Sequence, residues 1–459
     1  MFTLFFVSIA GVFLLVAAGY LYSFFVEQSQ KKTRLKMLSR ISNAETLLQS
    51  GMYDDGFAIY EEILDSLKSG NKWTAFQDVY ALCRYGEGKY FQRKAADDFT
   101  AYTNAVECYE EFLRYLSMPG LGLEEIIKKI EAHYNLGLLY VSCINKPQVK
   151  NRMTSLKRAE HLLTAALEFI NEISLQPLSP EESDQQEHYT TKVHASIYQA
   201  LGVIYSETSD TGLPKNAEKS LLKAIDAFDK ALQFFTAQEY PAEHTEILSA
   251  YANVYKKLFA LSGNINFMTV AAGTLKTLAD YLERNDRQSE LFTVIQDLGD
   301  SYMLMAQHLA ETGTEENNQN NEAKNAALTA AAEYYKKMID IPKGGNVFVT
   351  NSDLALMYQK VGSATIKLYH IGQHEPHLEE GLSLYQKALE YVAEGSLDFA
   401  NVQSVIGDLY VVLSRTHDRK ENIAKAKAAL NTALRIYDDM GLTPYKKNIE
   451  LSLKNIDGW

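Results

Sequence analysis

Three histidines within a short stretch are the strongest candidates for metal chemistry in this sequence. His370, His374 and His377 surround Glu375, and imidazole and carboxylate groups are ligands that zinc accepts. Pro376 interrupts the run, and the flanking pattern predicts a loop between the two helices of a hairpin. We interpret the run as a surface loop, with zinc binding as the alternative.

A glycine-rich string offers a second kind of chemistry, because glycines beside a lysine cradle phosphates in nucleotide-binding loops. Gly86-Glu87-Gly88-Lys89 lacks the flanking glycine and the Ser or Thr of a Walker loop. The surrounding residues follow a helical pattern, and no HExxH, GxSxG or dinucleotide fingerprint occurs in the sequence. We therefore predict no catalytic residue, no cofactor and no enzymatic activity.

A recurring five-residue phrase predicts the helices that must carry any site. In each copy, a small residue directly follows Leu, Ile or Tyr, and a Tyr stands three positions after the small residue. A small residue lets one helix approach another closely, and the flanking side chains fill the seam. A second helix follows each copy, with a small residue four before an aromatic or Leu, as in Ala224 and Phe228. The copies are Leu136-Gly137-x-x-Tyr140, Leu201-Gly202-x-x-Tyr205, Tyr251-Ala252-x-x-Tyr255, Leu298-Gly299-x-x-Tyr302, Leu354-Ala355-x-x-Tyr358 and Ile406-Gly407-x-x-Tyr410.

This self-similarity resembles the tetratricopeptide repeat (TPR) family over residues 37–440. The resemblance implies an all-α fold, a right-handed superhelical solenoid of about eight helix hairpins. The small residues recur every 47 to 65 positions, against about 34 in the family, so longer helices and loops are expected. Residues 443–457 open with Thr443-Pro444, a helix start signal, and predict a helix that caps the last repeat.

The N-terminus predicts a membrane anchor. Residues 1–26 carry no charged side chain, and a helix of residues 2–26 would span a bilayer core of about 30 Å. A basic n-region, which a cleaved signal peptide requires, is missing. A basic segment, 27–40, follows, and its cations would place the C-terminal part in the cytoplasm. These topology determinants are Lys31, Lys32, Arg34, Lys36 and Arg40.

An anchor followed by repeats resembles the overall plan of the lipopolysaccharide assembly protein B family, whose C-terminal CxxC module is absent here. This resemblance implies a single-pass protein of the bacterial inner membrane with a cytoplasmic solenoid. Two alternatives stay open: an exported adaptor in envelope or secretion assembly, and a receptor resembling those of organelle import.

Composition narrows the class of partner. The net charge of −13 argues against nucleic acid, which requires a basic face, and is compatible with protein or peptide partners. Cys83, Cys108 and Cys143 form no CxxC motif, so each is expected to pack as a small apolar residue.

In the TPR family, partners bind the concave surface formed by the first helix of each hairpin. The resemblance therefore implies a membrane-anchored scaffold that recruits or organises a protein assembly, and that also self-associates through terminal repeats. Of the basic clamp used by some members, only Asn253 and Lys256 match. The implied partner-binding residues are Tyr134, Gln199, Asn253, Lys256, Gln296, Asp300, Ser404 and Asp408.

Overall fold

The structure is a computed structural model that describes residues 2–69, 75–115, 123–174, 180–211, 214–312, 318–344, 347–372 and 374–457. Within these ranges, the side chains of residues 2–22, 123, 173–174, 180–189, 318–319, 344 and 457 are not described. The chain forms two compact units, Met1–Phe235 and Thr236–Trp459, and each is considered by itself.

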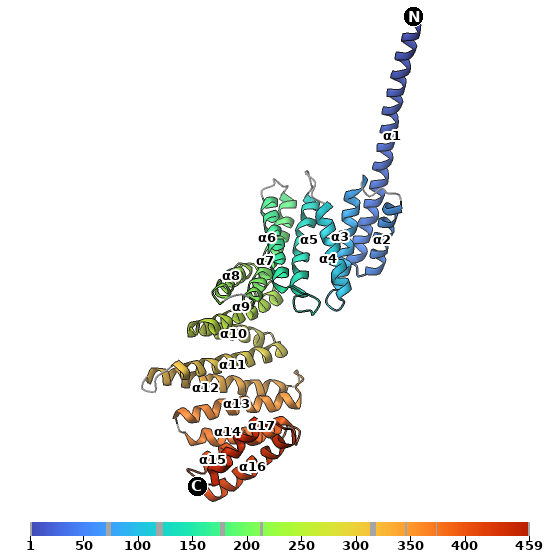
Figure 1. The fold of residues 1–459 in the computed structure, drawn as a ribbon. Helices are drawn as coiled ribbons and strands as arrows, with labels where there is room; N and C mark the ends of the chain where they lie inside the picture. The colour runs from blue at the N-terminus through green and yellow to red at the C-terminus, as the bar shows by residue number, and fades with distance from the viewer. Residues whose placement is uncertain are drawn as a thin grey trace. The chain divides into compact units, whose positions relative to one another are not determined.

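Each unit is a stack of helix hairpins in which consecutive helices pack against one another (Figure 1). The described residues form eight such hairpins and no strand, which confirms the expected all-α solenoid of tandem repeats. Unit 1 contains α1 (Phe2–Gln49), α2 (Tyr53–Ser69), α3 (Gln77–Lys94), α4 (Phe99–Tyr115), α5 (Leu123–Ser142), α6 (Arg152–Ser174), α7 (Pro180–Ser209) and α8 (Pro214–Leu232). Unit 2 contains α9 (Pro241–Ser262), α10 (Ile265–Arg284), α11 (Gln288–Thr312), α12 (Asn318–Asp340), the short 3₁₀ helix η2 (Ile341–Gly344), α13 (Asn351–Gly372), α14 (Glu375–Leu389), α15 (Leu397–Leu413), α16 (Arg419–Asp439) and α17 (Thr443–Asp457).

Glycines set the closest approach between the two helices of a hairpin. A Cβ added to Gly202 would lie less than 3.0 Å from the ring of Phe228, and one added to Gly299 would meet the ring of Tyr335 equally closely. Phe228 is fully buried, so its ring occupies the space that the missing side chain leaves. The small residue of the repeated phrase thus forms the seam, as the sequence predicts.

The seventh hairpin makes this contact at a different residue from the one that the phrase indicates. Ala355 is buried, but the ring of Tyr385 packs on Gly362, where an added Cβ would come closer than 3.0 Å. The two positions lie seven residues apart, which is about two helical turns, and so share one face of α13. The seam is therefore shifted along the helix by two turns.

The apolar core of each unit is divided into clusters, most of which join helices of more than one hairpin. In unit 1, Tyr85, Leu136, Leu163 and Ile197 belong to one buried cluster although they come from α3, α5, α6 and α7. The three cysteines are also buried. No single hairpin could bury its apolar face alone, which explains why several repeats are needed for stability.

The prediction of a single-pass protein of the bacterial inner membrane, with its solenoid in the cytoplasm, is corrected by the structure. Among the residues that the structure describes, no helix contains an apolar run of the length that a membrane crossing requires. Charged residues recur along the described side chains of α1, from Glu27 through the segment 27–40, whereas a span needs about 20 predominantly apolar residues in succession. The rest of the predicted span, residues 2–22, lies outside the described side chains.

Two of the five basic residues of this segment contact neighbouring helices. Arg34 Nη2 lies 2.5 Å from Asp78 Oδ2 on α3, and Arg40 forms an ion pair with Glu62 on α2. These contacts help to hold the C-terminal part of α1 against the first hairpins. The other three residues are exposed: Lys31, Lys32 and Lys36.

The last helix, α17, packs on the end of unit 2. Ile449 and Ile456 are buried in a cluster with residues of α15 and α16, and the rings of Tyr437 and Tyr445 lie 5.3 Å apart. This contact covers apolar side chains that the last hairpin would otherwise expose. Apart from the membrane anchor, which is corrected above, the predicted boundaries of the basic segment (27–40), the solenoid (37–440) and the cap (443–457) stay predictions.

Candidate functional site

A cavity of about 510 Å³ lies in unit 1, on the face shared by the first helices of three consecutive hairpins. Most of its lining comes from α1 and α3, whereas α2 adds two tyrosines and α5 adds Asn135. The lining residues are Glu45, Leu48, Gln49, Tyr53, Tyr60, Tyr85, Gly86, Lys89, Gln92, Arg93 and Asn135.

The glycine-rich string of α3 shapes this cavity. The string is helical. A Cβ on Gly86 would lie closer than 3.0 Å to the ring of Tyr60 on α2, and one on Gly88 would lie 3.0 Å from the ring of Tyr109 on α4. The two glycines therefore seat α3 against the helices before and after it. Lys89 follows directly, and the string packs helices together rather than forming a phosphate loop.

Two cations and one carboxylate line the cavity among the described residues. Lys89 and Arg93 lie one helical turn apart on α3, and so project from the same face. The Arg93 guanidinium carbon is 3.6 Å from the centre of the Tyr53 ring, and Lys89 Nζ is 5.3 Å from that of Tyr85. None of the ion pairs that the structure describes involves either cation.

The carboxylate of the lining, Glu45, is already engaged by a neighbouring cation. Lys128 Nζ on α5 lies 3.0 Å from Glu45 Oε1 and 2.8 Å from Glu124 Oε1. Hydrogen bonds to these groups raise the pKa of Lys128 although burial opposes them. This bridge connects α1 to α5 across the cavity wall.

Tyr60 carries one of the buried polar atoms that the described residues leave without a hydrogen-bond partner, and it is the one that lines this cavity. Its side chain has an exposed fraction of 0%, and its hydroxyl has no hydrogen-bond partner among the described residues. Burial, with the nearby Glu45 adding to it, raises the pKa of Tyr60. The hydroxyl therefore stays protonated and is a donor without an acceptor. Leaving such a group unpaired destabilises a folded protein.

Hydrogen bonds within the second hairpin and from it to α5 hold the other side of the cavity. Tyr109 donates to Gln92 Oε1 at 2.6 Å, and Gln92 Nε2 donates to Asn135 Oδ1 at 3.3 Å. Tyr85 donates to Glu131 on α5. Because α3, α4 and α5 share these bonds, the cavity wall is rigid before any ligand arrives.

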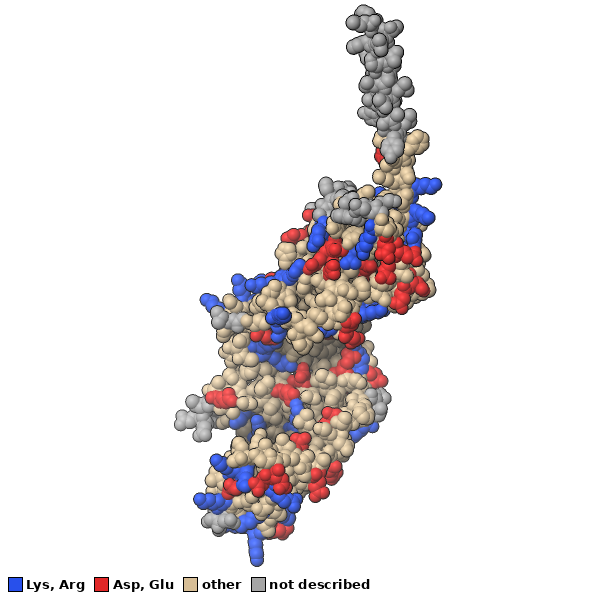
Figure 2. All heavy atoms as spheres, turned by 45° about the vertical axis from the view of Figure 1, so that its right-hand side comes forward, with Lys and Arg blue, Asp and Glu red and all other residues tan. Residues whose placement is uncertain are grey.

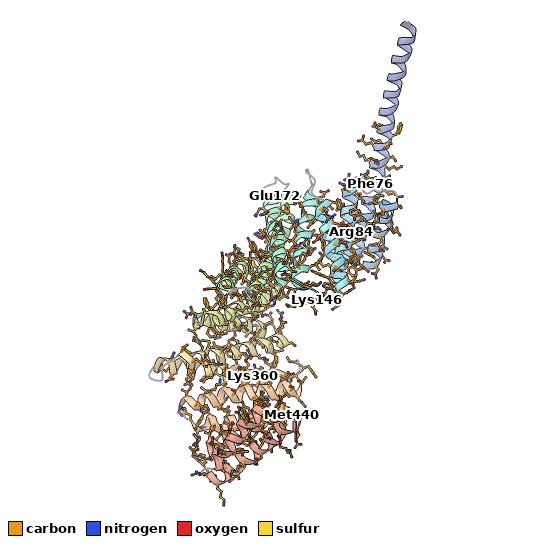
Figure 3. All side chains as sticks on the ribbon, viewed as in Figure 1. Phe76, Arg84, Lys146, Glu172, Lys360 and Met440 are labelled. Atoms are coloured by element: carbon orange, nitrogen blue, oxygen red, sulfur yellow. The ribbon has the colours of Figure 1, made fainter. Side chains whose placement is uncertain are left out.

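On another face of α3, a buried ion-pair network links α3 to α4. Arg84 Nε lies 2.6 Å from Glu111 Oε2, Tyr80 donates to the same oxygen at 2.7 Å, and Arg84 also pairs with Glu87 (Figure 3). Glu87 is only 5% exposed, and burial raises its pKa although Arg84 opposes that effect. Each member has a partner, so this network stabilises the junction of the two helices.

The sequence-predicted partner residues are distributed over α5, α7, α9, α11 and α15, and none lines the cavity. Two of them join neighbouring hairpins of unit 2. Lys256 Nζ lies 3.1 Å from Asp297 Oδ2, and Asp300 accepts from Lys360 Nζ at 2.5 Å and from Tyr335 at 2.5 Å (Figure 3). Tyr134 and Gln199 are half-buried in unit 1; in unit 2, Asn253 and Asp408 are exposed, and Gln296 and Ser404 are half-buried.

The histidine run lies mostly within helices rather than in a loop. His370 belongs to α13, His374 immediately precedes α14, and His377 lies within α14. The rings of His374 and His377 are 5.9 Å apart and perpendicular, and Glu375 Oε1 lies 3.0 Å from His417 Nε2. Within the described part of the chain, no group of three or more His, Cys, Asp or Glu side chains could hold a metal ion.

Comparison with known proteins assigns this chain to no family. No protein-family model matches the sequence, and no curated protein matches it. Among solved structures, the apo form of RapI is 10% identical, with 92% of this chain and 97% of that chain covered and a TM-score of 0.42. BtubC from P. vanneervenii is 14% identical over 64% and 88%, with a TM-score of 0.36. The TPR2AB domain of yeast Sti1, in a complex with pHSP90, is 14% identical over 82% and 98%, with a TM-score of 0.24.

The chain has an all-α fold of tandem helix hairpins. Basic and acidic side chains are intermixed on the faces that Figure 2 shows. Lys89 was considered from the sequence only within the glycine-rich string, and none of Tyr60, Lys89 and Arg93 was predicted as a partner-binding residue, because the predicted surface began at the third hairpin. A sequence signal for this site did exist. Gly88 is the small residue that packs against Tyr109, and Lys89 and Arg93 follow it on the same helix.

Proposed function

We propose that the protein is an interaction scaffold that binds a peptide segment of a partner protein on the α1, α3 and α5 face of unit 1, and so recruits that partner into an assembly. One observation carries this proposal. Three consecutive hairpins together line a single cavity that none of them forms alone. A repeat array binds in this way when neighbouring units contribute to one surface.

The size and lining of the cavity suit the anchoring side chains of a peptide. About 510 Å³ lies within the usual range of ligand sites. Tyr53 and Tyr85 supply large, rigid aromatic walls, which tend to carry much of the binding energy at interfaces. The bonds among Gln92, Asn135 and Tyr109 reduce the ordering that a partner must impose.

The partner-binding residues predicted from the sequence remain part of the proposal as a second contact surface. Asn253 and Asp408 are exposed on unit 2, but the Asp408 side chain is already hydrogen-bonded to Ser452 of α17. Lys256 and Asp300 already hold neighbouring hairpins together. A ligand would have to compete with these ion pairs, so we assign the first contact to unit 1.

The test is selection of peptides that bind the purified full chain from a random-sequence library, followed by measurement of their affinity. Replacing Lys89 and Arg93 by alanine should weaken the selected peptides about tenfold or more, because two charged contacts are lost. The matched control replaces Lys215 and Lys219, which are exposed and equally spaced on α8, and should change nothing. Equal losses in both pairs, or no selected peptide at all, would refute the proposed site.

A further inference from the structure

The cavity of unit 1 presents three hydrogen-bond donor groups, those of Tyr60, Lys89 and Arg93, for which no acceptor is found among the described residues. Lys89 and Arg93 form none of the described ion pairs, and the Tyr60 hydroxyl is buried without a partner. All three groups line the same cavity, and two of them are cations. A ligand that fits must therefore be rich in acceptor oxygens and negatively charged.

The remaining polar lining does not supply the missing acceptor. The Glu45 carboxylate is bound to Lys128 Nζ at 3.0 Å, and both polar atoms of the Gln92 side chain are engaged by neighbours. Gln49 and Asn135 have amide groups that can contact a ligand as donors or acceptors. Within the described lining, the positive charge is consequently in excess.

We propose that this cavity binds a phosphorylated tyrosine carried by the partner peptide, which rests on the function proposed above. A phosphate monoester carries close to two negative charges and three strong acceptor oxygens. Its charge is opposite to that of the two cations, and its oxygens can accept from all three donor groups. Arginine is suited to this contact because its planar fork can bind a phosphate with two parallel hydrogen bonds.

The apolar lining selects an aromatic carrier for that phosphate. Leu48, Tyr53 and Tyr85 line the cavity beside the cations, and aromatic rings pack favourably against one another. The volume of about 510 Å³ leaves space beyond a phosphate group for a ring. A phosphoserine would bring the charge but would leave this apolar space unfilled.

The unpaired Tyr60 hydroxyl gives the proposal a signature that a merely structural tyrosine would not show. Without ligand, the buried hydroxyl destabilises the fold, since it has no acceptor. Tyr60→Phe should therefore raise or preserve the thermal midpoint of the ligand-free protein while it weakens the phosphopeptide. A tyrosine that serves packing alone would leave the affinity for the phosphopeptide unchanged.

The experiment titrates the purified full chain with fluorescent nonapeptide mixtures that carry a central phosphotyrosine, tyrosine or phosphoserine between degenerate positions. Phosphotyrosine should bind at least about tenfold more tightly than either alternative, as expected when a charged contact or an apolar wall is lost. Phenyl phosphate should compete only weakly, because it lacks the peptide.

Variants then assign the preference to the cavity. Replacing Lys89 and Arg93 by methionine should remove the preference for phosphotyrosine, whereas the same change at Lys215 and Lys219 should keep it. Glu45→Gln should strengthen phosphopeptide binding several-fold, because a carboxylate near an anionic ligand is removed.

The outcomes separate the two proposals. If all three peptide mixtures bind equally and binding depends on Lys89 and Arg93, the scaffold function stands and the phosphotyrosine inference is wrong. If phosphoserine equals phosphotyrosine, the aromatic selection is wrong, and the inference falls with it. If phenyl phosphate binds as tightly as the peptide, the ligand is a free aryl phosphate, and the peptide-borne inference is overturned. If no mixture binds the chain, both the inference and the proposed function fail.

Discussion

Gly299 allows a sharp test of the packing that builds every hairpin. An alanine at this position would place its Cβ less than 3.0 Å from three ring atoms of Tyr335. The ring cannot easily move away, because Tyr335 is 2% exposed and its hydroxyl donates to Asp300 at 2.5 Å. Overpacking a core in this way costs about 1–3 kcal/mol.

The remaining contributions have opposite signs. A displaced ring would lose a hydrogen bond to a charged group, which contributes about 1.5–3 kcal/mol, whereas alanine in a helix interior gains about 1 kcal/mol over glycine. The net expectation for Gly299→Ala is a loss of roughly 2–5 kcal/mol. Gly273→Ala is the matched control in the same unit, since nothing lies within 4 Å of its added Cβ; it should gain about 1 kcal/mol.

The assay is urea unfolding followed by circular dichroism, combined with hydrogen exchange of the α11 and α12 amides, because repeat arrays can open one hairpin at a time. Exchange should accelerate in this hairpin for Gly299→Ala alone. A double variant with Tyr335→Leu should lose less than the sum of its parts. If Gly299→Ala is as stable as Gly273→Ala, the close-contact account of the repeat is refuted.

Three further variants test the charged and titrating groups. Arg84→Met leaves the buried Glu87 carboxylate without its cation and should lower the free energy of unfolding by about 3–5 kcal/mol. Arg40→Met removes the cation of an exposed ion pair and should lower the free energy of unfolding by no more than about 1 kcal/mol. Similar urea midpoints for the two variants would contradict this contrast. Burial lowers the pKa of His133 below its usual 6.5, so its contribution is present above pH 6.5 and is lost as the pH falls through the folded-state value. His133→Gln should flatten the stability profile between pH 7 and pH 5, and an unchanged slope would exclude this group as the cause. Lys360→Met should cost about 1–3 kcal/mol and reduce the salt dependence of the urea midpoint, since it removes a cation of the Asp300 ion pair.

The hairpins could be predicted from the sequence because their signal is local. Gly202 and Gly299 recur within helical patterns, and a small residue facing a large ring is a requirement that one helix pair satisfies by itself. The seam at Gly362 could not be chosen over Ala355, since both small residues lie on the same face of α13. Only the packing of α13 against α14 shows which of the two residues contacts the ring of Tyr385.

The cavity was harder to predict because its residues come from separate hairpins. Tyr60 belongs to α2, and Lys89 and Arg93 belong to α3, so their meeting depends on how one hairpin stacks on the next. The periodicity of apolar residues within one helix does not predict how successive hairpins stack. Lys256 and Asp300 illustrate the same limit, because pairing with residues of neighbouring helices cannot be read from spacing along the chain.

The shared carboxylate of Asp300 has a mechanical consequence for unit 2. Its oxygens bind Tyr335 of its own hairpin and Lys360 of the next, while Lys256 bridges the preceding hairpin to α11 through Asp297. A pull on the chain ends would load these bridges together. Under a stretching force, unit 2 should therefore unfold in steps that each involve several hairpins. It should refold in equally large steps when the force is removed.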